Sequence, residues 1–172
     1  MEIYEKAYEE AEKLGDKNSL IKCCISLGLH STLGNQYTKG LDYSYRALNL
    51  SKELDNKKML GESLYNIGIS YIFQSKGDKA LDYFKRTLKI YKQIGEKDLI
   101  GELFGRIGEA HLVGFNADEA EKYYQLALQE FENNNDKSNI GNRMSKLSSL
   151  LIFQGKYDEA LKYSIPSLKI HE

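Results

Sequence analysis

The chain has 172 residues, with 24 basic and 25 acidic side chains and a formal net charge of −1. Because it lacks the positive surplus that neutralises a nucleic-acid backbone, we expect no nucleic-acid partner. No apolar run is long enough to cross a bilayer, and the first residues lack the basic and apolar regions of a signal peptide. We therefore expect no membrane partner and a cytoplasmic location.

The sequence repeats with a period of forty residues, and the same residue types recur in the same columns. A fixed period of this length indicates supersecondary units that bury their apolar faces on one another. Two adjacent columns read Leu27, Ile67, Ile107, Leu147 and Gly28, Gly68, Gly108, Ser148. We expect a single array over 1–172, made of the second helix of a partial repeat at 1–20, full repeats at 21–60, 61–100 and 101–140, and a partial repeat at 141–172.

Each unit contains two stripes of apolar residues at helical spacing, for example Leu64, Ile67 and Tyr71 followed by Ala80 and Phe84. Each unit is therefore predicted to be a helical hairpin, and the chain is predicted to be all-α. Glycine or asparagine in the turns that join units can take the left-handed conformation that ends a helix. In chain order, the joining turns are 15–17, 55–57, 95–97 and 135–137, and the turns within hairpins are 34–36, 75–77, 115–117 and 155–157.

Glycine recurs inside the first helix of three hairpins, at Gly28, Gly68 and Gly108. Glycine inside a helix costs about 1 kcal/mol relative to alanine, so its recurrence needs a structural reason. We expect the second helix of each hairpin to lie close against these glycines, through its Ala80 or Ala120.

Each unit follows a large apolar residue with a small one, and later adds a small, an aromatic and a second small residue. The residues are Leu64, Ile67, Gly68, Tyr71, Ala80, Phe84 and Thr87 in one unit, and Phe104, Ile107, Gly108, His111, Ala120, Tyr124 and Ala127 in the next. This pattern resembles the tetratricopeptide repeat family. The resemblance implies a right-handed α-solenoid, a superhelix of antiparallel helix hairpins with a concave groove. The long unit is similar to the repeats of bacterial peptide-sensing regulators, Rap-type response-regulator phosphatases and Gα-binding adaptors.

One face of each first helix is expected to line this groove. A helical wheel predicts which residues lie opposite the core stripe of the first helices. They are Glu62, Asn66, Ile69 and Phe73 in one unit, Glu102, Arg106 and Glu109 in the next, and Lys146 in the last. Equivalent positions add Leu29, Leu33 and Phe153, and a purely solvated face would seldom carry these together with Ile69 and Phe73. The alternative is that the residue at the position of Phe73 in each unit packs on the neighbouring helix; these residues are Leu33, Phe73, Val113 and Phe153.

Two of these side chains have chemistry suited to a peptide. In the resembling family, an asparagine in the column of Asn66 often hydrogen-bonds the backbone of an extended peptide, because an amide offers both a donor and an acceptor. Arg106 could hold a carboxylate through two parallel hydrogen bonds. The alternative is that both are ordinary surface side chains.

No pattern for catalysis, metal binding or a cofactor is present in the sequence. The histidines stand in separate units, and no nucleophile or phosphate-binding motif occurs. Cys23 and Cys24 are adjacent on one predicted helix and cannot pair, and Cys24 lies in a core column. We expect a non-enzymatic protein without cofactors, in which these thiols are small buried hydrophobes.

The predicted function is a non-catalytic scaffold module that binds a protein or an extended peptide in its concave groove. A second hypothesis is a peptide-sensing regulatory domain of a larger signalling protein, such as a transcription regulator or a kinase or phosphatase regulator. A third is self-assembly, including a homodimer, through uncovered ends. Residues 1–14 would form a second helix without a first helix to pack on, and this motivates the third hypothesis.

Overall fold

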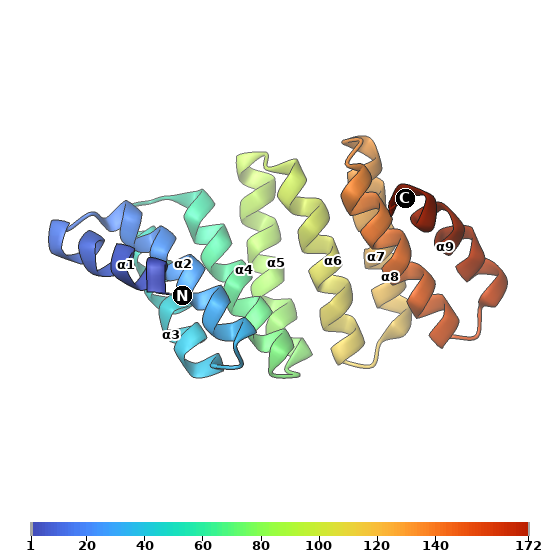
Figure 1. Ribbon diagram of the computed structural model, residues 1–172, viewed down its shortest axis with the longest axis horizontal. Coiled ribbons are helices and arrows are strands. Elements are labelled where there is room, and N and C mark those ends of the chain that lie inside the picture. Colours follow the sequence, from blue (N-terminus) through green and yellow to red (C-terminus); the bar gives the residue numbers. More distant parts are fainter. Residues whose placement is uncertain (1, 172) are drawn as a thin grey trace. The chain divides into compact units, whose positions relative to one another are not determined.

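The computed structural model describes residues 2–171, apart from the side chains of Asp98 and His171. Nine helices and no strand occur within this described part (Figure 1). They are α1 (Glu2–Leu14), α2 (Lys17–Leu33), α3 (Tyr37–Glu53), α4 (Lys57–Phe73), α5 (Gly77–Ile94), α6 (Lys97–Val113), α7 (Ala117–Asn133), α8 (Lys137–Phe153) and α9 (Tyr157–His171).

The helix boundaries repeat with the period of the sequence. The first helices of the hairpins, α2, α4, α6 and α8, begin at lysines forty residues apart. Asp16, Asn56 and Asp136 cap three of them, because each side chain accepts a hydrogen bond from a backbone N–H in the first turn. The helices begin four residues before the predicted unit boundaries, since the apolar columns locate core residues and not helix starts.

The turns that join the hairpins adopt the predicted left-handed conformation. Gly15, Gly95 and Asn135 all have positive φ. In the turn at 55–57, Asp55 rather than Asn56 has positive φ, at 50°. Asn56 instead caps α4, where its side chain accepts a hydrogen bond from the Met59 N–H. The prediction that Asn56 lies in a turn is therefore correct, but Asn56 caps α4 and does not take the left-handed conformation.

The chain forms two compact units, Met1–Gly95 and Glu96–Glu172, here called the N-terminal and C-terminal units. In the N-terminal unit, α2 packs against α3 and α4 against α5, and the first helices α2 and α4 also contact each other. In the C-terminal unit, α6 packs against α7, α7 against α8, and α8 against α9. Adjacent helices in each unit are joined by short turns, so each hairpin is antiparallel.

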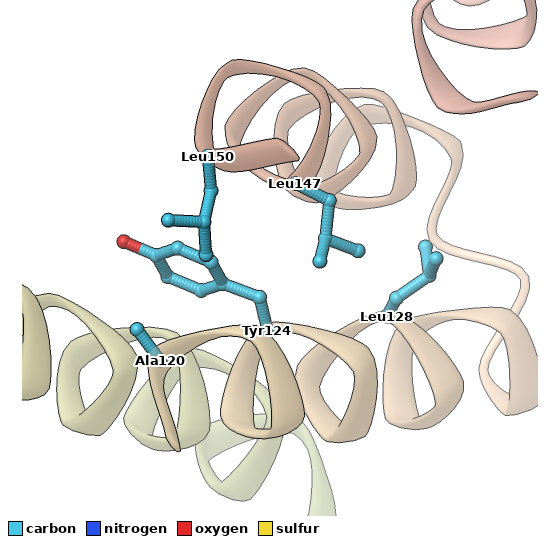
Figure 2. Close-up of a cluster of buried hydrophobic side chains, with 5 residues drawn as sticks. All are labelled: Ala120, Tyr124, Leu128, Leu147 and Leu150. Atoms are coloured by element: carbon cyan, nitrogen blue, oxygen red, sulfur yellow. The ribbon is translucent and has the colours of Figure 1, made fainter. Parts of the chain in front are cut away.

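Each unit has an apolar core between its hairpins. In the N-terminal unit, Leu48 of α3 packs with Leu64 and Ile67 of α4. In the C-terminal unit, one side of α7 meets α8, and Figure 2 shows these side chains pointing toward one another. They are Ala120, Tyr124 and Leu128 from α7 and Leu147 and Leu150 from α8.

The glycine column lies where the second helix of a hairpin packs directly against the first, as predicted. A Cβ on Gly68 would overlap the ring of Phe84 on α5, and a Cβ on Gly108 would lie 2.7 Å from the ring of Tyr124 on α7. The expected contact through Ala80 and Ala120 needs correction, because these aromatic rings fill the space over the glycines and Ala120 contributes its carbonyl oxygen.

The two cysteines are buried and free, as expected of small hydrophobes. Burial raises the pKa of the Cys24 thiol to about 11, with a smaller opposing effect of Arg46. At neutral pH the thiol is therefore protonated and shielded from solvent, and neither property suits a reactive cysteine.

Candidate binding site

The predicted binding residues fall in both units. Glu62, Asn66, Ile69 and Phe73 lie on α4 in the N-terminal unit, whereas Glu102, Arg106 and Glu109 lie on α6 and Lys146 on α8 in the C-terminal unit. The two groups are described separately.

In the N-terminal unit, the amide of Asn66 is part of the contact between first helices. The side chain is only 5% exposed, and its Nδ2 donates a hydrogen bond to the carbonyl oxygen of Ile25 on α2, 2.8 Å away. Thr32 of α2 and Ser70 of α4 share a buried hydrogen bond of 2.7 Å on the same pair of helices. Asn66 therefore binds the backbone of its own protein, and its predicted role toward a peptide stays a prediction.

The apolar residues of this face differ in exposure. Ile69 is 3% exposed and belongs to the core, whereas Phe73 is 42% exposed. The residues at the position of Phe73 in two other hairpins, Leu33 and Phe153, are 53% and 85% exposed. Large apolar side chains thus recur in solvent at the end of three first helices. The alternative expectation was that the neighbouring helix would bury these side chains. Much of each side chain is instead uncovered.

In the C-terminal unit, the charged residues of α6 and α8 form one connected network. The guanidinium of Arg106 lies 3.0 Å from the Glu102 carboxylate and 2.9 Å from that of Glu109. Glu109 also pairs with Lys146 at 2.9 Å, and Glu102 pairs with Arg143 at 2.6 Å. The predicted residues Glu102, Arg106, Glu109 and Lys146 are therefore brought together here.

The protonation of Glu109 follows from its surroundings. Burial opposes the charged form, but the nearby cations Arg106 and Lys146 outweigh burial and lower the pKa of Glu109 below its ordinary value. Glu109 is therefore ionised at neutral pH. Because Arg106 already contacts two carboxylates of its own helix, a ligand carboxylate would have to share or displace one of them.

Sequence reasoning missed Arg143, which anchors one end of this network. It is 5% exposed, and its Nε and Nη1 have no hydrogen-bond partner among the described residues. Its guanidinium lies against the backbone of Gly105, where a Cβ would overlap it. The repeat columns did indicate this contact. Arg143 is a charged residue in the column of Leu103 and Ser63, and Gly105 is a glycine in the column of Tyr65.

A pocket of about 520 Å³ lies in the C-terminal unit. Its walls come from the end of α6, the turn that follows, the start of α7 and one side of α8. Among its lining residues are Leu112, Phe115, Tyr124, Lys146, Leu150 and Phe153. Lys146 therefore belongs to both the charged network and the pocket wall.

Among residues 2–171, apart from the two side chains left undescribed, no three histidine, cysteine or carboxylate side chains gather in a way that could hold a metal ion. None of the helices in the same part of the chain combines the length and apolar character of a membrane span.

The fold and the site together define an all-α protein built from repeated helical hairpins. Residues 24–93 match the sequence model of the tetratricopeptide repeat. The predicted resemblance and the predicted all-α hairpin fold are both confirmed. No curated protein sequence matches the chain.

Solved structures support the same fold. A Rap protein complexed with Competence and Sporulation Factor matches 97% of this chain at a TM-score of 0.88 and 20% identity. The apo form of RapI matches at 0.83 and 20%, and BtubC (BKLC) from P. vanneervenii matches at 0.85 and 19%, each over 97% of this chain. This chain spans 48%, 61% and 70% of those three structures, respectively. At these identities the likeness shows the fold alone.

Proposed function

We propose that this chain is a non-catalytic module that binds a protein or peptide through the exposed faces of its first helices, α2, α4, α6 and α8. The observation that carries the proposal is the recurrence of Leu33, Phe73 and Phe153 at one repeat position with large exposed fractions. A single exposed apolar residue is ordinary, but a series at equivalent positions has no role in the core and suits contact with a partner.

The charged network supports the same proposal. Arg106 and Lys146 are 33% and 47% exposed at the side chain, so both reach solvent on the α6 and α8 side of the C-terminal unit. Glu102 and Glu109 hold these long side chains in place, which reduces the conformational entropy lost when a partner binds. Asn66 contributes by holding α4 against α2.

A test compares partner capture by the immobilised chain and its variants from the native lysate. Combined Leu33→Ser, Phe73→Ser and Phe153→Ser substitutions should abolish capture while leaving the helical content unchanged. Leu126→Ser is the matched control, because Leu126 is 40% exposed but lies on the second helix α7. Capture that survives the triple substitution would refute the proposed surface.

Asn66→Ala is a poor test of binding, although sequence reasoning alone would choose it. The variant removes the donor to the Ile25 carbonyl at a buried position, and such a loss typically costs about 1 to 3 kcal/mol of stability. A weaker capture by this variant would report both folding and binding.

The second candidate is a peptide-sensing regulatory domain. It is favoured by the likeness to the Rap protein whose structure holds Competence and Sporulation Factor. The capture experiment separates the candidates, since mass spectrometry of the eluate distinguishes a short peptide from a folded protein. A peptide eluted from the unsubstituted chain and absent from the triple variant would favour the sensor.

A further inference from the structure

The turn between α6 and α7 places a phenylalanine in an unfavourable backbone conformation. Phe115 has φ of 58°, in the left-handed region, where the equivalent turns have Asn35, Ser75 and Gly155. For a residue with a side chain this region costs roughly 1 to 2 kcal/mol. The Phe115 side chain is 97% exposed, so burial within this chain does not offset the cost.

The exposed ring of Phe115 borders the pocket of the C-terminal unit. Phe153, which is 85% exposed, and Leu112, which is 37% exposed, border the same pocket. The volume of about 520 Å³ lies within the range of roughly 300 to 1,000 Å³ that is usual for ligand sites. Two large aromatic rings therefore flank a hollow that can accept an apolar side chain of a partner.

The charges around this pocket differ between its sides. Among the described residues that line it, Lys146 is the one charged side chain. Lys146 also belongs to the network on α6 and α8, where it pairs with Glu109 at 2.9 Å. Ala117 of the pocket wall leads into the first turn of α7, which carries Asp118 and Glu119, and Glu119 pairs with Lys122. Lys146 is 47% exposed at the side chain, so a ligand carboxylate at the pocket can reach this cation and share it with Glu109.

We propose that this pocket binds a peptide that inserts a large apolar side chain between Phe115 and Phe153 and places an adjacent acidic side chain at Lys146. The inference rests on the proposed binding function and deepens it, since it names one site and the chemistry of its ligand. Binding buries the exposed ring of Phe115, and the free energy of this burial offsets the backbone cost of the turn. Local strain retained in this way is typical of ligand-binding segments.

The test uses a fluorescent synthetic peptide in which a phenylalanine is followed by an aspartate, and fluorescence polarisation measures its dissociation constant. Replacing the peptide's phenylalanine with alanine should weaken binding about tenfold or more, as for a buried aromatic anchor. Replacing its aspartate with asparagine should weaken binding several-fold to the unsubstituted chain. The same replacement should make little difference to the Lys146→Gln variant.

The decisive variant is Phe115→Gly, which gives the turn the residue found at Gly155. Because glycine relieves the backbone strain, the melting temperature should stay the same or rise, while peptide affinity falls about tenfold or more. Leu126→Ala is the matched control, since Leu126 is an exposed apolar residue of the same unit that does not line the pocket. It should leave the affinity unchanged.

Several results would overturn the inference. Unaltered affinity of the Phe115→Gly variant would show that the ring does not contact the peptide. Failure of the unsubstituted chain to bind the acidic peptide would reject the ligand chemistry, whereas lysate capture that depends on Leu33, Phe73 and Phe153 would leave the general proposal standing. A dimer in sedimentation that Phe115→Gly dissociates would identify a second copy of the chain as the occupant instead.

Discussion

The contact between Gly105 and Arg143 makes a quantitative prediction about stability. Gly105→Ala gains about 1 kcal/mol of helix propensity in α6. The new Cβ overlaps the Arg143 guanidinium, which is buried, paired with Glu102 at 2.6 Å and placed 5.9 Å from the centre of the Phe131 ring. Displacing a packed group typically costs about 1 to 3 kcal/mol, so Gly105→Ala alone should destabilise the chain by about 1 kcal/mol.

The effect of Gly105→Ala on stability should change from destabilising to stabilising in a chain that lacks Arg143. Arg143→Leu removes two buried donors that have no partner in the described part of the chain, and Glu102 keeps Arg106 at 3.0 Å, so this variant should be neutral or slightly stabilised. In that background Gly105→Ala should stabilise by up to about 1 kcal/mol, which gives a coupling energy of about 2 kcal/mol. Urea unfolding followed by far-UV circular dichroism measures all four proteins. Additive effects, with coupling under about 0.5 kcal/mol, would refute the proposed contact.

Three further predictions follow from the same geometry. Gly68→Ala should destabilise the chain by about 1 to 3 kcal/mol, because the new Cβ meets the ring of Phe84, which is fully buried and cannot move aside. Gly114→Ala is the control, since its Cβ would meet nothing nearer than 3.5 Å. In the same unfolding assay its stability should lie within about 0.5 kcal/mol of the unsubstituted chain. The lowered pKa of Glu109 means that its ion pairs stabilise the fold above its ordinary pKa of 4.5 and lose this effect as pH falls through the lower folded value. Glu109→Gln should therefore be less stable than the unsubstituted chain at neutral pH, and urea unfolding across a pH series should show the two converging at acid pH; a constant difference would contradict this. The fully buried thiol of Cys24 should react with a thiol reagent only on unfolding, and rapid labelling of Cys24 in the native chain would argue against its burial.

The predicted hairpins were accurate because their causes are local. The period of the apolar residues and the turn residues between them depend on neighbours a few positions away. The glycine column was also interpreted correctly, since a recurring cost in helix propensity indicates close packing. Its partner was only partly predicted. The rings of Phe84 and Tyr124 reach back over Gly68 and Gly108, and the direction of a side chain depends on the packed helix pair.

The predicted site illustrates where sequence reasoning ends. A helical wheel gives the direction of Asn66 but does not say what lies there, and the structure places the Ile25 carbonyl of α2 at that point. The same limit explains Ile69, which was expected on an exposed face and is buried. The helical wheel placed Arg106 beside Glu109, because both lie on one helix. It could not predict the pair between Glu109 and Lys146, because this pair joins two helices.

The sequence by itself determined the helices, their pairing into hairpins and the positions of the close contacts, because each follows from residue type and spacing along the chain. Only the tertiary structure decided which side chains of the first helices reach solvent and which pair with one another. Exposure and pairing depend on helices whose residues are about forty positions apart, as with Gly105 and Arg143. The distance between two such helices is set by the packing of every side chain between them, and the pattern of either helix alone does not contain it.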